Sequence, residues 1–179
     1  MLLDSIRNCG KIFAVVFCPS RPYVTMACRL VFFDVAGAEN LLRQFRDGRF
    51  IVNGYMPRVV RNRFKTLAQP PSHASRVLHI KGPSCIINQP NLSSLFRSGN
   101  IVWQDEEVIV LSHNGAFNLL EWRFASYRRQ AATARHLINR MKREPPVSQS
   151  QLWQQVTVRY GVDPCAPRLP PNNTMSSRS

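Results

Sequence analysis

The chain has 179 residues, 44% of them hydrophobic, and its 24 basic side chains against 10 acidic ones give a formal net charge of +14. This length accommodates one large domain or two small ones, and the charge exceeds what solubility requires and indicates a polyanionic partner. The five cysteines show no CxxC or paired spacing, which argues against a zinc site and a disulfide framework. No apolar run is long enough to span a bilayer and no secretory leader is recognisable, so we expect no membrane association and an intracellular location, nuclear or cytoplasmic.

The positive charge is mostly arginine, since only four of the 24 basic residues are lysines. Residues 1–65 carry 11 basic and 4 acidic side chains, and residues 76–160 carry 11 and 5, so both halves share the charge. A guanidinium binds phosphate through a fork of donors and also stacks on bases, which an ammonium cannot do. The composition therefore favours a nucleic acid over an acidic protein as the partner.

In the N-terminal half, the pattern predicts a helix end, two strands, a second helix and a third strand. Leu2, Leu3 and Ile6 have helical spacing, and Gly10 is a typical helix stop. Alternation along the second strand places four apolar side chains on one face, namely Met26, Cys28, Leu30 and Phe32. The expected elements are a helix end over residues 1–10, strands over 11–17 and 23–33, a helix over 36–48 and a strand over 50–63.

A Pro- and Ser-containing stretch without hydrophobic periodicity, residues 66–75, is predicted to be a linker, after which the pattern restarts. Asn88 is a suitable helix cap, and Pro90 stands at the start of the helix that follows it. Residues 163–179 are rich in Pro, Asn and Ser and are predicted to be a disordered tail. The expected elements are strands over 76–83, 106–112, 117–126 and 156–160, and helices over 88–96 and 127–142.

Two stretches resemble the RNA recognition motif (RRM) family. VFFDVAGAENLL resembles the third strand and second helix of that domain, and VNGYMPRVV resembles its asparagine-glycine turn and fourth strand. The resemblance implies an α+β fold of two ferredoxin-like βαββαβ sandwiches, a tandem repeat that covers most of residues 1–162. Residues 1–65 would form an incomplete RRM-like domain, in the order helix, strand, strand, helix, strand, that lacks the first strand. Residues 76–162 would form a complete one.

RRM domains bind single-stranded RNA on the open face of the sheet, where rings on the first and third strands stack on bases. In residues 76–162, the resemblance places His79 at the stacking position of the first strand. Leu119 and Glu121 occupy the two third-strand positions that carry rings in the family, which departs from the family pattern. The RNA-binding residues that the resemblance implies for this domain are His79, Lys81, Leu119, Glu121, Arg123 and Arg159.

The first domain departs further, because Ala27 and Arg29 stand at its stacking positions. A base stacked on an aromatic ring contributes about 1–3 kcal/mol, so the missing rings predict weak, salt-sensitive binding led by contacts between arginines and phosphates. The unpaired strands of this domain would also offer backbone groups for self-association. The RNA contacts implied here are Arg29, Arg58, Arg61 and Arg63.

Two other interpretations are open. An RRM-like protein-interaction module would use its helices or the Trp153 region and bind little or no RNA. A small ferredoxin-like enzyme, such as an acylphosphatase, needs an anion-cradling loop after the first strand, and GPSC is too short and lacks a basic residue. No catalytic triad, Cys-His pair or paired carboxylates stand out, so we expect no enzymatic activity, no metal and no cofactor. Trp122 and Phe124 face inward in the proposed strand phase and are expected in the core.

Overall fold

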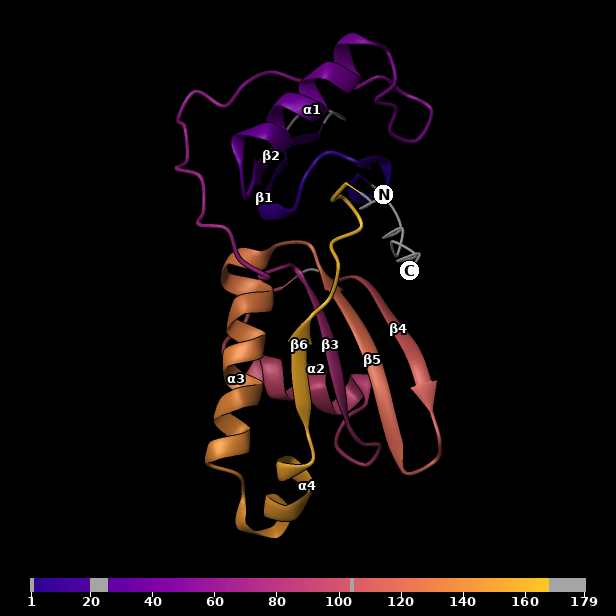
Figure 1. The fold of residues 1–179 in the computed structure, drawn as a ribbon, viewed down its shortest axis with the longest axis vertical. Helices are drawn as coiled ribbons and strands as arrows, with labels where there is room; N and C mark the ends of the chain where they lie inside the picture. The colour runs from indigo at the N-terminus through magenta and orange to yellow at the C-terminus, as the bar shows by residue number, and fades with distance from the viewer. Residues whose placement is uncertain (1, 20–25, 104, 168–179) are drawn as a thin grey trace, which may run out of the picture.

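The computed structural model describes residues 2–19, 26–103 and 105–167, which form an α+β fold with two antiparallel sheets and four α-helices (Figure 1). In chain order the elements are β1 (Ile12–Pro19), β2 (Met26–Phe32), α1 (Val35–Arg46), β3 (Val77–Pro83), α2 (Gln89–Ser98), β4 (Asp105–His113), β5 (Phe117–Phe124), α3 (Ala132–Arg143), α4 (Ser150–Gln154) and β6 (Thr157–Tyr160). One sheet has the order β1-β2, and the other has the order β4-β5-β3-β6. We call the first sheet with α1 the upper part and the second sheet with its helices the lower part, as they lie in Figure 1.

In the upper part, α1 packs beside the β1–β2 hairpin. The helix begins where the Asp34 carboxylate accepts a hydrogen bond of 2.7 Å from the backbone N–H of Gly37, which satisfies a free donor of the first turn. A Cβ on Gly37 would lie 2.7 Å from the Phe32 ring, so this close approach requires glycine. The two predicted strands and the helix are found, apart from residues 23–25, which lie outside the described residues. Only a short 3-10 turn, Leu3–Ser5, forms within the predicted helix end.

The prediction of a strand over residues 50–63 is wrong. Its asparagine-glycine turn does form, with positive φ at Asn53 and Gly54, and Val52 and Tyr55 exchange backbone hydrogen bonds of 2.8 and 3.0 Å. The rest of the segment is irregular and belongs to no sheet. A strand needs a neighbour to pair its backbone groups, and the described residues give the β1–β2 sheet no third strand. Pro57 also removes one backbone donor.

In the lower part, the predicted strands and helices form within a few residues of their expected bounds. Asn88 caps α2 as expected, because its side chain accepts a hydrogen bond of 2.9 Å from the backbone N–H of Asn91. The helix predicted from residue 127 starts irregularly, since Tyr127–Ala131 contains Arg129 at φ 62°, and regular helix begins at Ala132. The short helix α4 is an addition that the pattern did not predict.

The core of the lower part lies between the sheet and its helices. Every second residue of β5 points into it, so that Trp122 and Phe124 are fully buried, as expected. Their rings stack with centroids 5.9 Å apart, and Phe96 of α2 packs edge-on against Trp122 at 5.1 Å. Trp153 of α4 is also buried in this core and only 4% exposed. Trp153 therefore stabilises the fold, and it is not a free anchor for a partner.

A buried ion pair joins the upper and lower parts. The side chains of Arg76 and Asp163 are both fully buried, and Arg76 Nε lies 3.0 Å from Asp163 Oδ1. The second carboxylate oxygen accepts a hydrogen bond of 2.8 Å from the backbone N–H of Ile12, the first residue of β1. Arg76 Nη1 donates to the carbonyl of Phe124 at the end of β5. One charged pair therefore connects the beginning of β3, the end of β5, the beginning of β1 and the segment after β6.

The segment after β6 does not behave as a disordered tail over residues 163–167. In Figure 1 it rises from β6, in yellow, into the upper part. Asp163 and Cys165 are 1% and 0% exposed, and the carbonyl of Cys165 accepts hydrogen bonds of 2.9 and 3.1 Å from the N–H groups of Cys9 and Gly10. The sequence-based expectation is therefore wrong for residues 163–167. Residues 168–179, the rest of the predicted tail, lie outside the described residues.

Aromatic rings fill the junction beside the ion pair. Phe13 and Phe33 come from the upper part, and Tyr127 and Tyr160 come from the lower part. The centroid of Tyr127 lies 5.0 Å from Phe33, 5.9 Å from Phe13 and 5.9 Å from Tyr160. Rings at such separations attract one another in addition to burying apolar surface. The two parts are thus held together by hydrophobic contact as well as by charge.

Side chains of the lower part also cover the outer edge of β1. The Ser126 hydroxyl accepts a hydrogen bond of 2.8 Å from the N–H of Val15 and lies 3.3 Å from the carbonyl of the same residue, to which it donates. Together with the bond from Ile12 to Asp163, this occupies backbone groups that an unpaired edge would offer to another strand. Self-association through these strands remains a prediction, with fewer free groups to support it.

We expect Asp163→Ala to lower the free energy of unfolding by about 3–5 kcal/mol, because removing one partner of a buried ion pair leaves an uncompensated charge. Urea unfolding at pH 7 measures the change. The control is Asp47→Ala, which removes an exposed ion pair with Arg49 of 2.6 Å and should cost less than about 1 kcal/mol. Equal effects of the two substitutions would contradict the role given to Asp163.

Candidate nucleic-acid interface

The uncovered face of the four-stranded sheet brings most of the predicted RNA-binding residues of the lower part together. β3 lies between β5 and β6, so that His79 stands opposite Glu121 on one side and Arg159 on the other. Lys81, two residues further along β3, stands opposite Leu119. Lys81 and Arg159 are exposed, and the other three side chains are half-buried. The predicted residues are neighbours in space, and their contact with RNA remains a prediction.

Four of the side chains on this face form one chain of polar contacts. His79 Nε2 lies 2.8 Å from Glu121 Oε2, and Arg123 Nε donates a hydrogen bond of 2.7 Å to Glu121 Oε1. Arg123 Nη1 in turn lies 2.5 Å from Glu107 Oε2 on β4. Glu121 therefore accepts from two sides, and the guanidinium of Arg123 lies between two carboxylates. The network fixes these side chains along three adjacent strands.

The network determines the charge of Glu121. Burial by itself would raise the pKa of this carboxyl group, but the hydrogen bonds from His79 and Arg123 and the positive charge of Arg123 hold the pKa below its ordinary value. Glu121 is consequently ionised at neutral pH, and its charge is offset by Arg123. Lys81 and Arg159 pair with no carboxylate among the described residues. These two cations are available to an anion that approaches the sheet.

Gly161 is a further residue of this face, and sequence reasoning missed it. A Cβ at this position would lie 2.7 Å from His79 Nε2 and 2.8 Å from the Val77 side chain. Its backbone N–H donates a hydrogen bond of 2.9 Å to the carbonyl of Val77. Glycine therefore leaves the space in which the His79 imidazole lies against Glu121. The only sequence signal was a glycine directly after the last predicted strand.

Of the arginines predicted for the first domain, only Arg29 lies on a strand. Arg29 on β2 donates a hydrogen bond of 3.3 Å from Nη2 to the carbonyl of Phe64, and Arg61 lies 3.7 Å from the Glu39 carboxylate of α1. Arg58 and Arg63 are exposed on the irregular segment between the asparagine-glycine turn and the linker. The strand assignment of Arg58, Arg61 and Arg63 is thus corrected, and their contact with RNA remains a prediction.

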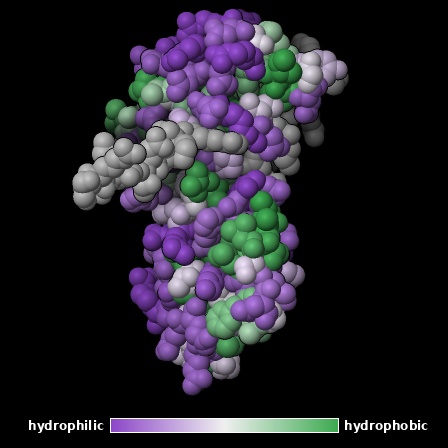
Figure 2. Space-filling view, turned by 45° about the vertical axis from the view of Figure 1, so that its right-hand side comes forward, coloured by the Kyte–Doolittle hydropathy of each residue, from purple (hydrophilic) through white to green (hydrophobic). Residues whose placement is uncertain are grey.

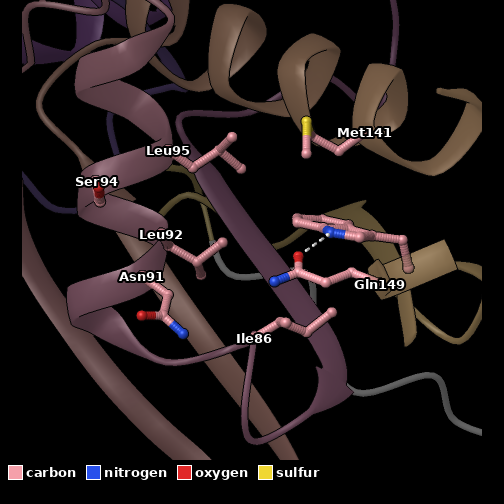
Figure 3. Close-up of a pocket in the computed structure, with 8 residues that line it drawn as sticks. Ile86, Asn91, Leu92, Ser94, Leu95, Met141 and Gln149 are labelled. Carbon is pink, nitrogen blue, oxygen red and sulfur yellow. Dashed lines mark hydrogen bonds between the residues drawn. The ribbon is translucent and has the colours of Figure 1, made fainter. Parts of the chain in front are cut away.

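Two depressions lie away from the uncovered sheet face. The larger, with a volume of about 260 Å³, lies between α2, α3 and α4 and is lined mainly by apolar side chains (Figure 3). In it, Trp153 Nε1 donates a hydrogen bond of 3.2 Å to Gln149 Oε1, which ties the indole to the protein's own chain. The smaller depression, of about 190 Å³, is polar and lined by Asn8, Asn40, Arg43, Gln44 and Arg49.

The space-filling view shows a mostly hydrophilic surface on the upper part and a gathered hydrophobic patch on the lower part (Figure 2). The exposed apolar side chains of the lower part include Val102, Val110 and Leu111, which are 88%, 60% and 47% exposed.

The described residues show no other recognisable chemistry. No three His, Cys, Asp or Glu side chains among them are grouped as a metal site would need. The five cysteines are free thiols, and burial together with the neighbouring Cys18 raises the pKa of Cys28 to about 11, which disfavours the reactive thiolate. None of the described helices has both the length and the apolar character needed to cross a membrane.

Comparison with known proteins gives no match to any family model, any curated protein or any solved structure.

We expect Glu121→Gln to reduce the dependence of stability on acidic pH. Because the pKa of Glu121 is lower in the folded chain, the ionised carboxylate stabilises the fold above the ordinary carboxyl pKa, and this stabilisation is lost as pH falls through the folded value. The substituted chain should be less stable than the wild type at pH 7, and the difference should shrink towards pH 3. Urea unfolding of both proteins across this range measures it. A difference that stays constant with pH would show that ionisation of Glu121 is not responsible.

Proposed function

We propose that the chain is a non-enzymatic RNA-binding protein and that residues 76–162 act as an RRM-like domain. Two features of the fold support the assignment. The chain order of this part is βαββαβ, and its sheet order β6-β3-β5-β4 places the first and third strands of the unit, β3 and β5, at the centre. These are the strands that contact RNA in the family that the sequence resembles. The upper part supplies additional positive charge, and it lacks the strand pattern of a second complete domain.

One observation carries the proposal. On the uncovered sheet face, two cations that form no ion pair with a described carboxylate lie beside the imidazole of His79. Lys81 lies two residues from His79 on β3, Arg159 stands opposite His79 on β6, and neither cation has a carboxylate partner among the described residues. A single strand of RNA lying across β3 would meet two phosphate-binding groups and one ring able to stack on a base. With Leu119 and Glu121 at the other stacking positions, phosphate contacts contribute most of the affinity.

A protein-interaction module is the second candidate. The polar network that holds Glu121 favours it, because two of the positions where rings would contact bases carry a leucine and an ionised carboxylate instead. Such a surface would bind another protein without using phosphate contacts. An RNA-binding measurement separates the two functions, because a protein-interaction module should have no RNA affinity at physiological salt.

We expect Lys81→Glu with Arg159→Glu to weaken binding of a mixed-sequence single-stranded RNA and to reduce its salt dependence. Each phosphate contact to a single strand contributes about 0.7 to the slope of log K against log salt, so the slope should fall by about 1.4. Fluorescence anisotropy over a salt series gives both quantities.

The matched control is Arg140→Glu with Arg143→Glu, which changes net charge equally on exposed positions of α3. Circular dichroism establishes that each variant folds. Equal weakening by the two double variants would show that net charge, and not the sheet face, governs binding. Absence of RNA binding by the wild type at physiological salt would give the protein-interaction function the lead.

A further inference from the structure

A second candidate surface for RNA lies on the irregular segment 51–67, here called the strap, which crosses the outside of the β1–β2 hairpin. Three hydrogen bonds attach it and its extension to β2 and the residue after it. Asn62 Nδ2 donates to the carbonyl of Leu30 at 3.0 Å, and Arg29 Nη2 donates to the carbonyl of Phe64 at 3.3 Å. The N–H of Gln69 donates to the carbonyl of Phe33 at 2.8 Å. Val52 and Val59 of the strap also pack against the core of the upper part, whereas most of its other side chains are exposed.

The strap exposes two aromatic rings and four cations. Tyr55 and Phe64 are 78% and 72% exposed, which is unusual for side chains with so much apolar surface to bury. Tyr55 is displayed by the turn at Asn53 and Gly54, and Phe64 stands between Arg63 and Lys65. The Arg63 guanidinium lies 5.8 Å from the centroid of the Phe64 ring. Neither ring belongs to the hydrophobic core of the upper part.

The charge of the strap is almost uncompensated. Arg58, Arg61, Arg63 and Lys65 lie along it, and Arg29 lies beside it on β2. Among the described residues, one carboxylate pairs with these cations: Glu39, which is exposed and lies 3.7 Å from Arg61. Exposed pairs of this kind are weak. The strap therefore presents a run of positive charge to solvent.

Solvent-exposed rings and solvent-exposed cations on one segment match a ligand that carries both bases and phosphates. In a single-stranded nucleic acid each nucleotide offers a base face for stacking and a phosphate for a guanidinium. A duplex hides the base faces, and an acidic peptide uses the cations but leaves the rings without a partner. We propose that the strap is a binding surface for single-stranded RNA, with Tyr55 and Phe64 stacking on bases. This inference rests on the proposed function and adds a surface outside the four-stranded sheet.

The test uses a double variant, here called the ring variant, that carries Tyr55→Ala and Phe64→Ala. The control is a second double variant that carries Val60→Ala and Leu67→Ala. The control removes apolar side chains of the same segment that are 66% and 87% exposed, so neither double variant disturbs the core. Each stacked base contributes roughly fivefold to a hundredfold in affinity. We expect the ring variant to lose about thirtyfold or more in affinity for a labelled mixed-sequence single-stranded RNA, with an unchanged salt slope, and the control to lose little.

Two further probes exclude simple charge attraction. Heparin and poly-glutamate carry negative charge and no bases, so the ring variant should bind them as the wild type does.

A chain with Arg58, Arg61 and Arg63 replaced by glutamine should lower the salt slope for RNA by about 2, which is three contacts at about 0.7 each. Photo-crosslinking of thiouridine-labelled RNA to the wild-type chain should label peptides that contain Tyr55 or Phe64.

The outcomes separate this inference from the proposed function. Loss of RNA affinity by the ring variant alone, with heparin and poly-glutamate binding retained, supports the strap. Wild-type affinity in the ring variant, or an equal loss for all three ligands, overturns it. If the ring variant binds normally while Lys81→Glu with Arg159→Glu weakens binding, the sheet-face function stands and the strap inference fails. If the wild type binds no RNA at physiological salt, both fail.

Discussion

The buried contact between Arg76 and Asp163 is the interaction on which the arrangement of the two sheets depends. One carboxylate binds the guanidinium of Arg76 and, through its other oxygen, the N–H of Ile12. A charge placed where water cannot reach it must find partners in the protein. The start of the small sheet, the start of the central strand β3 and the segment after β6 are therefore constrained to meet at one point. The aromatic rings beside it then fill the junction and exclude solvent.

A second set of charges shapes the uncovered sheet face. The network from His79 through Glu121 to Arg123 and Glu107 joins two carboxylates to one guanidinium and one imidazole across three strands. Only Lys81 and Arg159 remain to attract a phosphate. In the proposed function, this face differs from a sheet lined with rings, because RNA affinity would depend on ionic strength more than on stacking. The strap beside β2 differs from this face, because it exposes aromatic rings among its cations.

The sequence predicted the lower part well because its signals are local. Alternation in β5 identified Trp122 and Phe124 as core residues. Asn88 predicted the start of α2, because its cap is a hydrogen bond to a residue of the same helix. The failures share a physical cause. A strand over residues 50–63 depends on a pairing partner elsewhere in the chain, and local propensity carries no information about that partner. Asp163 lies in a stretch with the composition of a disordered tail, and it is ordered by a contact with Arg76 that no local pattern encodes. The same holds for Gly161, whose importance comes from His79.

The contact of Asp163 with Ile12 has a consequence for how the chain folds during synthesis. The two residues are separated by 151 positions, and contacts of such long range form late because the intervening chain must first be ordered. During synthesis the β1–β2 hairpin is made before the groups that cover its edge, since Val15 is separated from Ser126 by 111 positions and Ile12 from Asp163 by 151. Until those groups have been made, the backbone groups of this edge are open to wrong pairing.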